Sequence, residues 1–367
     1  MQLLKKKFDS PFAEMSGIKC DSDQAKVDIH RYEVLLRTGG LHALGKEYAL
    51  GRIDVTHVED LLIDIIENSQ KLPGKFSWAM WSHILKQIFM NPQKGLGAFL
   101  VAEKHYNLGN ELFKNMLDKS MSYTCAIWDG VNNLEQAQEK KLRVICEKLD
   151  LKPGMKVLDI GCGWGNFARF AAKNYKVSVV GLTVSDQQAE YAKEICKGER
   201  VEILLEDYRN FEGSFDRVVS IEMIEAVGKR NLNLYFEKVH DFLNKDGIFL
   251  IQAISTESFS LKSHVAVDQY LLWLLEYIFP NGYIPNLPEL VQPARRLFVL
   301  SNLDNISRNY IHTLNAWREN FLKAWPTLVN EYDEQFKHIW LYYLGGCIAF
   351  FKLGLAQVYQ ISYKKVV

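Results

Sequence analysis

The chain has 367 residues, enough for two or three domains, and its 44 basic and 44 acidic residues balance. This balance gives no overall attraction to nucleic acid, so we expect no nucleic-acid partner. The six cysteines form no C-x-x-C pair and lie at no zinc-finger spacing from a histidine, so we expect free thiols in the cytoplasm and no metal.

Residues 1–74 have mostly helical periodicity and end at the breaker Pro73-Gly74, so we expect a small helical N-terminal domain. Residues 75–99 then predict an amphipathic helix and a linker. The helix places Trp78 and Trp81 on one side with lysines beside them. That pattern is typical of a helix at a membrane interface, and also of one packed on the catalytic domain.

The remainder, residues 100–367, predicts one catalytic domain in which strand patterns alternate with helix patterns. Such alternation indicates an α/β fold, a doubly wound parallel sheet with helices on both faces. The strand patterns lie at 156–160, 177–183, 201–205, 215–221 and 247–253, and the helix patterns between them at 168–174, 187–197 and 231–243.

The regular alternation then ends. Residues 254–300 combine a predicted helix at 268–279 with a stretch rich in proline and glycine, so we expect a lipid-binding insertion that shapes an apolar slot. A long helical run follows over 310–343. The uncharged apolar stretch 339–351 is shorter than the ~20 residues of a membrane span. We expect a buried helix there, broken or closely packed at Gly345-Gly346.

The most informative segment is 157–165, Val-Leu-Asp-Ile-Gly-Cys-Gly-Trp-Gly. It predicts a strand that carries Asp159 and runs into a turn with Gly161, Gly163 and Gly165, where the backbone can approach a ligand closely. The helix that follows offers free N–H groups. The glycine spacing differs from the dinucleotide fingerprint and resembles motif I of the S-adenosylmethionine (SAM) methyltransferases. An ordinary glycine-rich turn is the alternative.

In a parallel sheet, ligands bind beyond the carboxyl ends of the strands. This rule brings four predicted loops together: 161–165, 183–188, 207–208 and 222–228. Four loops that converge on one crevice support a ligand site more strongly than one motif does.

Five segments carry a wider resemblance: 103–110, 123–128, 158–165, 277–282 and 313–317. They make nearly the whole chain similar to the bacterial cyclopropane-fatty-acyl-phospholipid synthase family. The resemblance implies a Rossmann-like SAM-dependent methyltransferase fold with a small helical N-terminal domain. It implies transfer of a methylene from SAM to the cis double bond of unsaturated membrane phospholipids. It also implies a homodimer, peripheral at the membrane surface on the inner face.

The resemblance further implies a set of contacts to SAM. Tyr123 and Thr124 would lie near its methionyl end with the three glycines beneath, Thr183 and Gln188 would meet the ribose, and Asp207 and Tyr208 would flank the adenine. Tyr106 and Asp159 complete this predicted site, Tyr106 as a residue that braces the pocket.

An isolated alkene is a poor nucleophile, and methyl transfer to it leaves a carbocation that aromatic faces can stabilise. A base must then remove a proton from the new methyl group so that the ring closes. The resemblance implies that this base is bicarbonate. Its implied cradle consists of Cys125, Glu225, Gln252, Tyr310 and the backbone N–H near Ile254.

Two positions depart from the family pattern. Gln252 stands where bacterial members usually have His, and Ala226 replaces a His after Glu225. Gln can donate and accept hydrogen bonds, so it can still hold an anion, but it removes a titratable group. We expect a raised pKa for Glu225 beside an anion.

Three hypotheses remain open from the sequence. The first is a cyclopropane synthase, and the second is a lipid methyltransferase that makes methyl- or methylene-branched acyl chains, which the departure at Gln252 keeps open. The third is a silent SAM- or lipid-binding protein, against which Cys125, Glu225 and Tyr310 argue. Cys125 by itself also fits a packed core thiol.

Overall fold

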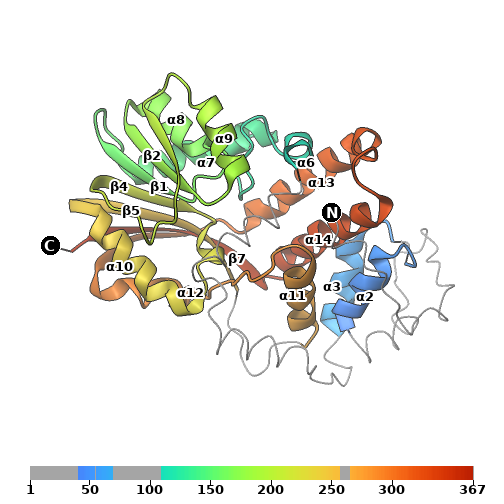
Figure 1. Ribbon diagram of the computed structural model, residues 1–367. Helices are drawn as coiled ribbons and strands as arrows, with labels where there is room; N and C mark the ends of the chain where they lie inside the picture. The colour runs from blue at the N-terminus through green and yellow to red at the C-terminus, as the bar shows by residue number, and fades with distance from the viewer. Residues whose placement is uncertain (1–39, 54, 69–108, 257–264, 367) are drawn as a thin grey trace.

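The computed structural model describes residues 40–53, 55–68, 109–256 and 265–366 (Figure 1). The predicted helix with Trp78 and Trp81 lies outside the described residues. So do Tyr106 and most of the predicted N-terminal domain.

A mixed sheet of seven strands forms the centre of the molecule, in the order β3-β2-β1-β4-β5-β7-β6. The first five strands of this order are parallel, whereas β7 is antiparallel to both of its neighbours. The strands are β1 (Lys156–Ile160), β2 (Ser178–Thr183), β3 (Val201–Leu205), β4 (Phe215–Ile221), β5 (Leu243–Thr256), β6 (Phe298–Asn305) and β7 (Ala356–Lys365).

The predicted α/β fold and its five strands are confirmed. The expectation of a purely parallel sheet is wrong, because β7 inserts between β5 and the edge strand β6. About a hundred residues separate β5 from β7 in the chain. Their pairing is therefore set by tertiary contacts, which a local sequence pattern does not contain.

Helices cover both faces of the sheet, as the alternation of side chains along each strand requires. Val157 on β1 faces a core shared with α7 and α8, while its neighbour Leu158 faces a core shared with α10 (Figure 1). The helices of these layers are α7 (Leu134–Lys148), α8 (Asn166–Tyr175), α9 (Asp186–Ile195), α10 (Leu232–Phe242) and α12 (Leu287–Val291), with the short helices η3 (Ile224–Ala226), η4 (Lys229–Asn231) and η5 (Ala294–Arg296).

A second group of helices packs beside the carboxyl end of the sheet, around a core rich in aromatic residues. It contains α2 (Gly40–Ala49), α3 (Val58–Asn68), α6 (Asn110–Met116), α11 (Val265–Tyr277), α13 (Arg308–Leu328) and α14 (Glu334–Lys352). The single helical run expected over 310–343 is wrong. It is two helices, because Asp333 caps α14 by accepting a hydrogen bond from the N–H of Phe336 (2.8 Å).

The expected close packing at Gly345-Gly346 is confirmed, and α14 runs through both glycines unbroken. A Cβ at Gly345 would lie 2.8 Å from Val58 of α3, and one at Gly346 would lie 2.1 Å from the ring of Tyr270 on α11. Across the residues that the structure describes, no helix is both long and apolar enough to cross a membrane.

We predict that Gly346→Ala destabilises the protein by about 1–3 kcal/mol, because the added methyl group collides with the Tyr270 ring. Chemical denaturation of this variant, of Tyr270→Leu and of the double variant gives a mutant cycle. The double variant should lose less stability than the sum of the single losses. If the two losses of stability were strictly additive, the added methyl group would not contact the Tyr270 ring.

Candidate active site

The four predicted loops do lie at the carboxyl ends of parallel strands. Residues 161–165, 183–188, 207–208 and 222–228 follow β1, β2, β3 and β4 in turn. The strand order places β1 next to β4, which is the position where the chain reverses direction across the sheet. This edge of the sheet is therefore where a ligand site is expected.

The glycine-rich turn after β1 has left-handed backbone conformations at Gly161, Gly163 and Gly165, with φ of 82°, 54° and 83°. A Cβ at Gly161 would lie 2.3 Å from Met223, and one at Gly165 would lie 2.9 Å from Ala192. At Gly163 a Cβ would meet nothing within 4 Å among the described residues. The turn is thus closely packed at its first and last glycines and open at its middle glycine, where a ligand can approach the backbone.

Asp159 is buried at the end of β1, and its Oδ2 has no hydrogen-bond partner among the described residues. Burial raises the pKa of this carboxyl group to about 7, against the opposing charge of Lys141. Lys141 is itself buried, which lowers the pKa of its amine, and it donates a hydrogen bond to Thr124 Oγ1 (2.7 Å). The site therefore keeps an orphaned carboxylate oxygen that a cationic ligand would satisfy.

The two residues predicted to meet the ribose contact each other. The hydroxyl of Thr183 donates to Oε1 of Gln188 (2.9 Å), so the NH2 group of Gln188 points away from Thr183. Asp207 accepts hydrogen bonds from the guanidinium of Arg209, including one from Nε to Oδ1 (2.8 Å). Arg209 lies over the Tyr208 ring, 5.8 Å from its centroid. The carboxylate of Asp207 is thus paired with a cation, so it is less available to accept a hydrogen bond from adenine.

The predicted cradle residues converge on a carboxylate that sequence reasoning missed, that of Glu222. Its Oε1 accepts hydrogen bonds from the backbone N–H of Cys125 (2.9 Å) and from Nε2 of Gln252 (2.7 Å). Its Oε2 accepts one from the hydroxyl of Tyr310 (3.1 Å). The available signal in the sequence was an acidic residue placed directly after the buried strand β4.

The fourth cradle residue, Glu225, lies on η3 and accepts a hydrogen bond at Oε1 from the N–H of Ile254 (2.6 Å). Its Oε2 is buried without a hydrogen-bond partner among the described residues. Burial, helped by the charge of Glu222, raises the pKa of Glu225 to about 8. The rise agrees in direction with the sequence-based expectation and leaves this side chain a neutral acid at pH 7.

A hydrogen-bonded chain fixes the amide of Gln252. Its Oε1 accepts from Nε2 of Gln360 (2.9 Å), and Gln360 in turn accepts from Nζ of Lys148 (2.6 Å). With its oxygen held by Gln360, Gln252 presents only N–H donors to Glu222 and to the carbonyl of Cys125. In the structure Gln252 therefore acts as a donor to the carboxylate of Glu222, and its predicted contact with bicarbonate stays a prediction.

Aromatic rings form one wall beside this cluster. Tyr310 packs on Phe351 (4.8 Å between ring centroids) and on Trp317 (5.8 Å), and Trp317 packs on Tyr123 (5.0 Å). The Tyr123 hydroxyl shares a hydrogen bond with that of Tyr343 (2.7 Å). The wall joins the predicted methionyl end of the SAM site to the Glu222 cluster and can stabilise positive charge between them.

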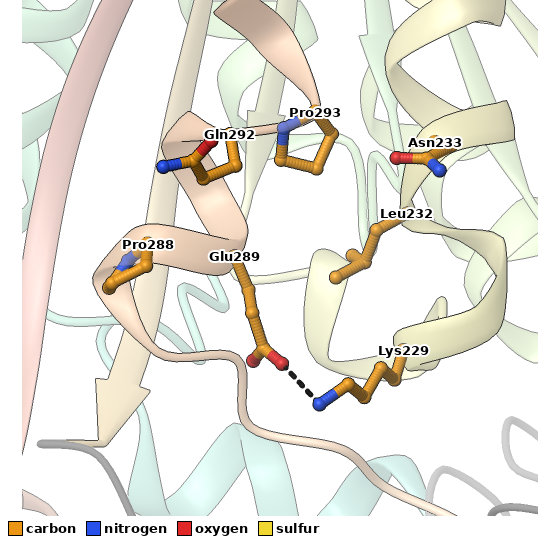
Figure 2. Close-up of a pocket in the computed structure, with 7 residues that line it drawn as sticks. All are labelled: Lys229, Leu232, Asn233, Pro288, Glu289, Gln292 and Pro293. Carbon is orange, nitrogen blue, oxygen red and sulfur yellow. Dashed lines mark ion pairs between the residues drawn. The ribbon is translucent and has the colours of Figure 1, made fainter.

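Tyr283 and Glu289 support the segment that carries Glu225 through hydrogen bonds. The N–H of Tyr283 donates to the Glu225 carbonyl (2.8 Å), and the Tyr283 hydroxyl donates to Glu289 (2.6 Å). Figure 2 shows that Glu289 also forms an ion pair with Lys229 (2.8 Å) across a hollow between α10 and α12. This hollow contains none of the predicted site residues, so we do not take it as the substrate site.

Among the described residues, His57, Glu59 and Asp60 bring potential metal ligands within 4.8 Å of one another. Glu59 is already engaged by Arg318 (2.6 Å). We therefore keep the absence of a metal as a prediction.

Comparison with known proteins gives consistent results. The sequence profile described as mycolic acid cyclopropane synthetase matches residues 97–361. The chain is 40% identical over 336 residues, 91% of this chain and 85% of the relative, to the cyclopropane-fatty-acyl-phospholipid synthase of Escherichia coli (strain K12). It is 30% identical to the tuberculostearic acid methyltransferase UfaA1 of Mycobacterium tuberculosis, over 90% of this chain and 81% of the relative.

A solved structure with the same fold is that of mycolic acid cyclopropane synthase CmaA1, complexed with SAH and CTAB. It matches with a TM-score of 0.70 and 28% sequence identity, and the match covers 73% of this chain and 98% of that one.

We predict that Glu225→Gln stabilises the protein increasingly as the pH rises. The folded-state pKa of about 8 lies above the unfolded value, so the stability contributed by the neutral acid is complete below pH ~4.5 and is lost as the pH rises through 8. Gln cannot ionise and escapes this loss.

Denaturation curves from pH 5 to 8 measure the effect. The gain of the variant over the wild type should grow by roughly 3 kcal/mol across this range. The exposed Glu237→Gln serves as the control and should show no such trend. A difference that stays constant with pH would show that Glu225 is ionised throughout.

Proposed function

The chain belongs to the mycolic acid cyclopropane synthetase family, and on this premise we propose that it is a SAM-dependent cyclopropane-fatty-acyl-phospholipid synthase. It transfers a methylene, derived from the SAM methyl group, to the cis double bond of an unsaturated phospholipid acyl chain. The observation that carries this proposal is the likeness to the Escherichia coli synthase over nearly the whole chain.

SAM fits the turn after β1. The open side of Gly163 admits its methionyl end, and the orphaned oxygen of Asp159 offers a partner to its ammonium group. We assign Tyr123 and Thr124 to the methionyl end, the amide of Gln188 to the ribose and the ring of Tyr208 to the adenine, as the sequence predicts. Tyr106 is assigned to this pocket from the sequence alone.

The aromatic wall supports the chemistry. Methyl transfer to an alkene generates a carbocation on the acyl chain, and water would quench it. The rings of Tyr310, Trp317 and Tyr123 pack on one another in a row, with Tyr310 and Trp317 buried, and the electron-rich faces of such rings stabilise a cation. A base within reach must then remove a proton from the new methyl group.

Bicarbonate, the base that the resemblance implies, does not fit the contacts of the described residues. The donors of Cys125, Gln252 and Tyr310 already bind the Glu222 carboxylate, and the N–H of Ile254 already binds Glu225. The Cys125 thiol, whose pKa burial raises, donates to the carbonyl of Ala126 (3.4 Å). We therefore assign no step to bicarbonate.

A second candidate function is a SAM-dependent lipid methyltransferase that makes methyl- or methylene-branched acyl chains. The likeness to the tuberculostearic acid methyltransferase UfaA1, also over most of the chain, favours it. Both reactions share the methyl transfer and differ in which proton leaves the carbocation.

We further propose that the protein acts as a peripheral enzyme at the inner face of the membrane, because its substrate is a membrane lipid. A homodimer is the proposed assembly. The edge strand β6 supports it, since Val299, Leu300 and Leu303 are exposed there. The domain division at 1–74, 75–99 and 100–367, with a lipid-binding insertion near 254–300, is part of the same proposal.

We predict that the purified protein, given SAM and vesicles of monounsaturated phospholipid, yields fatty acids heavier by one CH2. Mass spectrometry should show a product that lacks the double bond and resists mild hydrogenation, as a cyclopropane does. A branched product would favour the second function. No product with bound SAM would contradict both.

We predict that Gly163→Ala weakens SAM binding by about tenfold or more, because its methyl group fills the space left for the ligand. Gly154→Ala is a matched control. Gly154 also has a positive φ (89°), and a Cβ there also meets nothing within 4 Å. Both variants should lose similar stability, about 1 kcal/mol, whereas calorimetry should show weaker SAM binding only for Gly163→Ala. Equal affinities would place SAM elsewhere.

A further inference from the structure

The Glu222 carboxylate occupies the place that the resemblance gives to bicarbonate. Both groups are planar anions with one negative charge, the carboxylate with two oxygens and bicarbonate with three. Three donors converge on Glu222: the N–H of Cys125, Nε2 of Gln252 and the hydroxyl of Tyr310, at 2.9, 2.7 and 3.1 Å. The protein therefore supplies from its own chain the anion that these donors hold.

Two features of Glu222 are energetically unfavourable and distinguish it from an ordinary structural residue. Glu222 is a non-glycine residue with φ of 49°, a left-handed conformation that costs roughly 1–2 kcal/mol. Its carboxylate is also buried beside a second buried carboxyl, that of Glu225, and burying a charge is unfavourable unless it is well paired. Strain and buried charge that persist together are typical of functional sites.

The contacts decide which of the two carboxyl groups is ionised. Burial raises the pKa of Glu222, and its three hydrogen bonds and the positive charge of Lys141 offset part of that rise. The carboxyl group of Glu225 accepts hydrogen bonds only from backbone N–H groups, among them that of Ile254, and its pKa is raised to about 8. The larger number of donors therefore favours the negative charge of the pair on Glu222 over Glu225.

The position of Glu222 relative to the aromatic wall matches the task of a base. Tyr310 donates to Glu222 and packs its ring on Trp317, which packs on Tyr123. Cys125, whose N–H binds Glu222, is two residues from Tyr123 in the chain. The carboxylate thus lies at one end of the row of rings to which the proposed function assigns the stabilisation of the carbocation.

Resting on the proposed function, we propose that Glu222 is the catalytic base for this reaction, and that the protein needs no bicarbonate. The S–CH3 bond of SAM breaks as a C–C bond to the acyl chain forms, which leaves S-adenosylhomocysteine and a carbocation. Glu222 takes a proton from the new methyl group, and the electron pair of that C–H bond closes the ring. Glu222 becomes the neutral acid and releases its proton to water after the product leaves.

The test measures turnover with monounsaturated phospholipid vesicles in buffer stripped of CO2, with and without added bicarbonate. Wild-type turnover should be the same in both buffers. Glu222→Gln keeps the shape of the side chain without its basicity and should lose on the order of 10²-fold or more in turnover. Its remaining product should include an alcohol heavier by CH4O, because water then captures the carbocation.

Glu222→Gly is the second variant. Glycine accepts the left-handed backbone without strain, so the variant should fold and bind SAM like the wild type. It frees the donors of Cys125, Gln252 and Tyr310. Added bicarbonate should therefore restore its turnover by about tenfold or more, whereas Glu222→Gln, whose side chain still fills the cradle, should not respond. The exposed Glu237→Gln controls for the loss of a carboxylate as such.

Two results would overturn the assignment: a wild-type enzyme that loses most of its turnover without bicarbonate, or a Glu222→Gln variant with near wild-type turnover. Failure of the proposed function looks different. In that case the wild type binds SAM but forms no altered fatty acid in either buffer.

Discussion

The site depends on how one buried negative charge is held at the end of β4. A carboxylate removed from water is unfavourable unless polar groups replace its hydration. At Glu222 those groups come from three distant parts of the chain: the segment before α7, strand β5 and helix α13. Any change in how these elements pack would leave the charge unpaired, so the fold of the catalytic region and the electrostatics of the site are linked.

The mixed sheet explains how such distant residues meet. Parallel strands bring the ends of β1 and β4 to one edge, where the open turn at Gly163 and the Glu222 loop lie side by side. Antiparallel β7 then lies against β5 and supplies Gln360, which sets the direction of the Gln252 amide. The helices α13 and α14 add buried aromatic rings to the core beside this edge.

Much of this arrangement could be predicted from residue patterns. The glycine-rich turn, the five parallel strands and the grouping of Cys125, Gln252 and Tyr310 all follow from local signals or from the resemblance. Glu222 was missed because its importance lies in a left-handed backbone angle and in donors far away in sequence, neither of which a pattern shows. Strands β6 and β7 were missed for a related reason, since their pairing depends on tertiary packing.

The most direct test of this account uses SAM with a trideuterated methyl group, in buffer free of CO2, followed by mass spectrometry of the fatty acids. If a carboxylate of the protein removes one hydrogen from the transferred methyl group, the product keeps two deuterium atoms on the new carbon. A product that keeps all three, or one that forms only when bicarbonate is added, would contradict it.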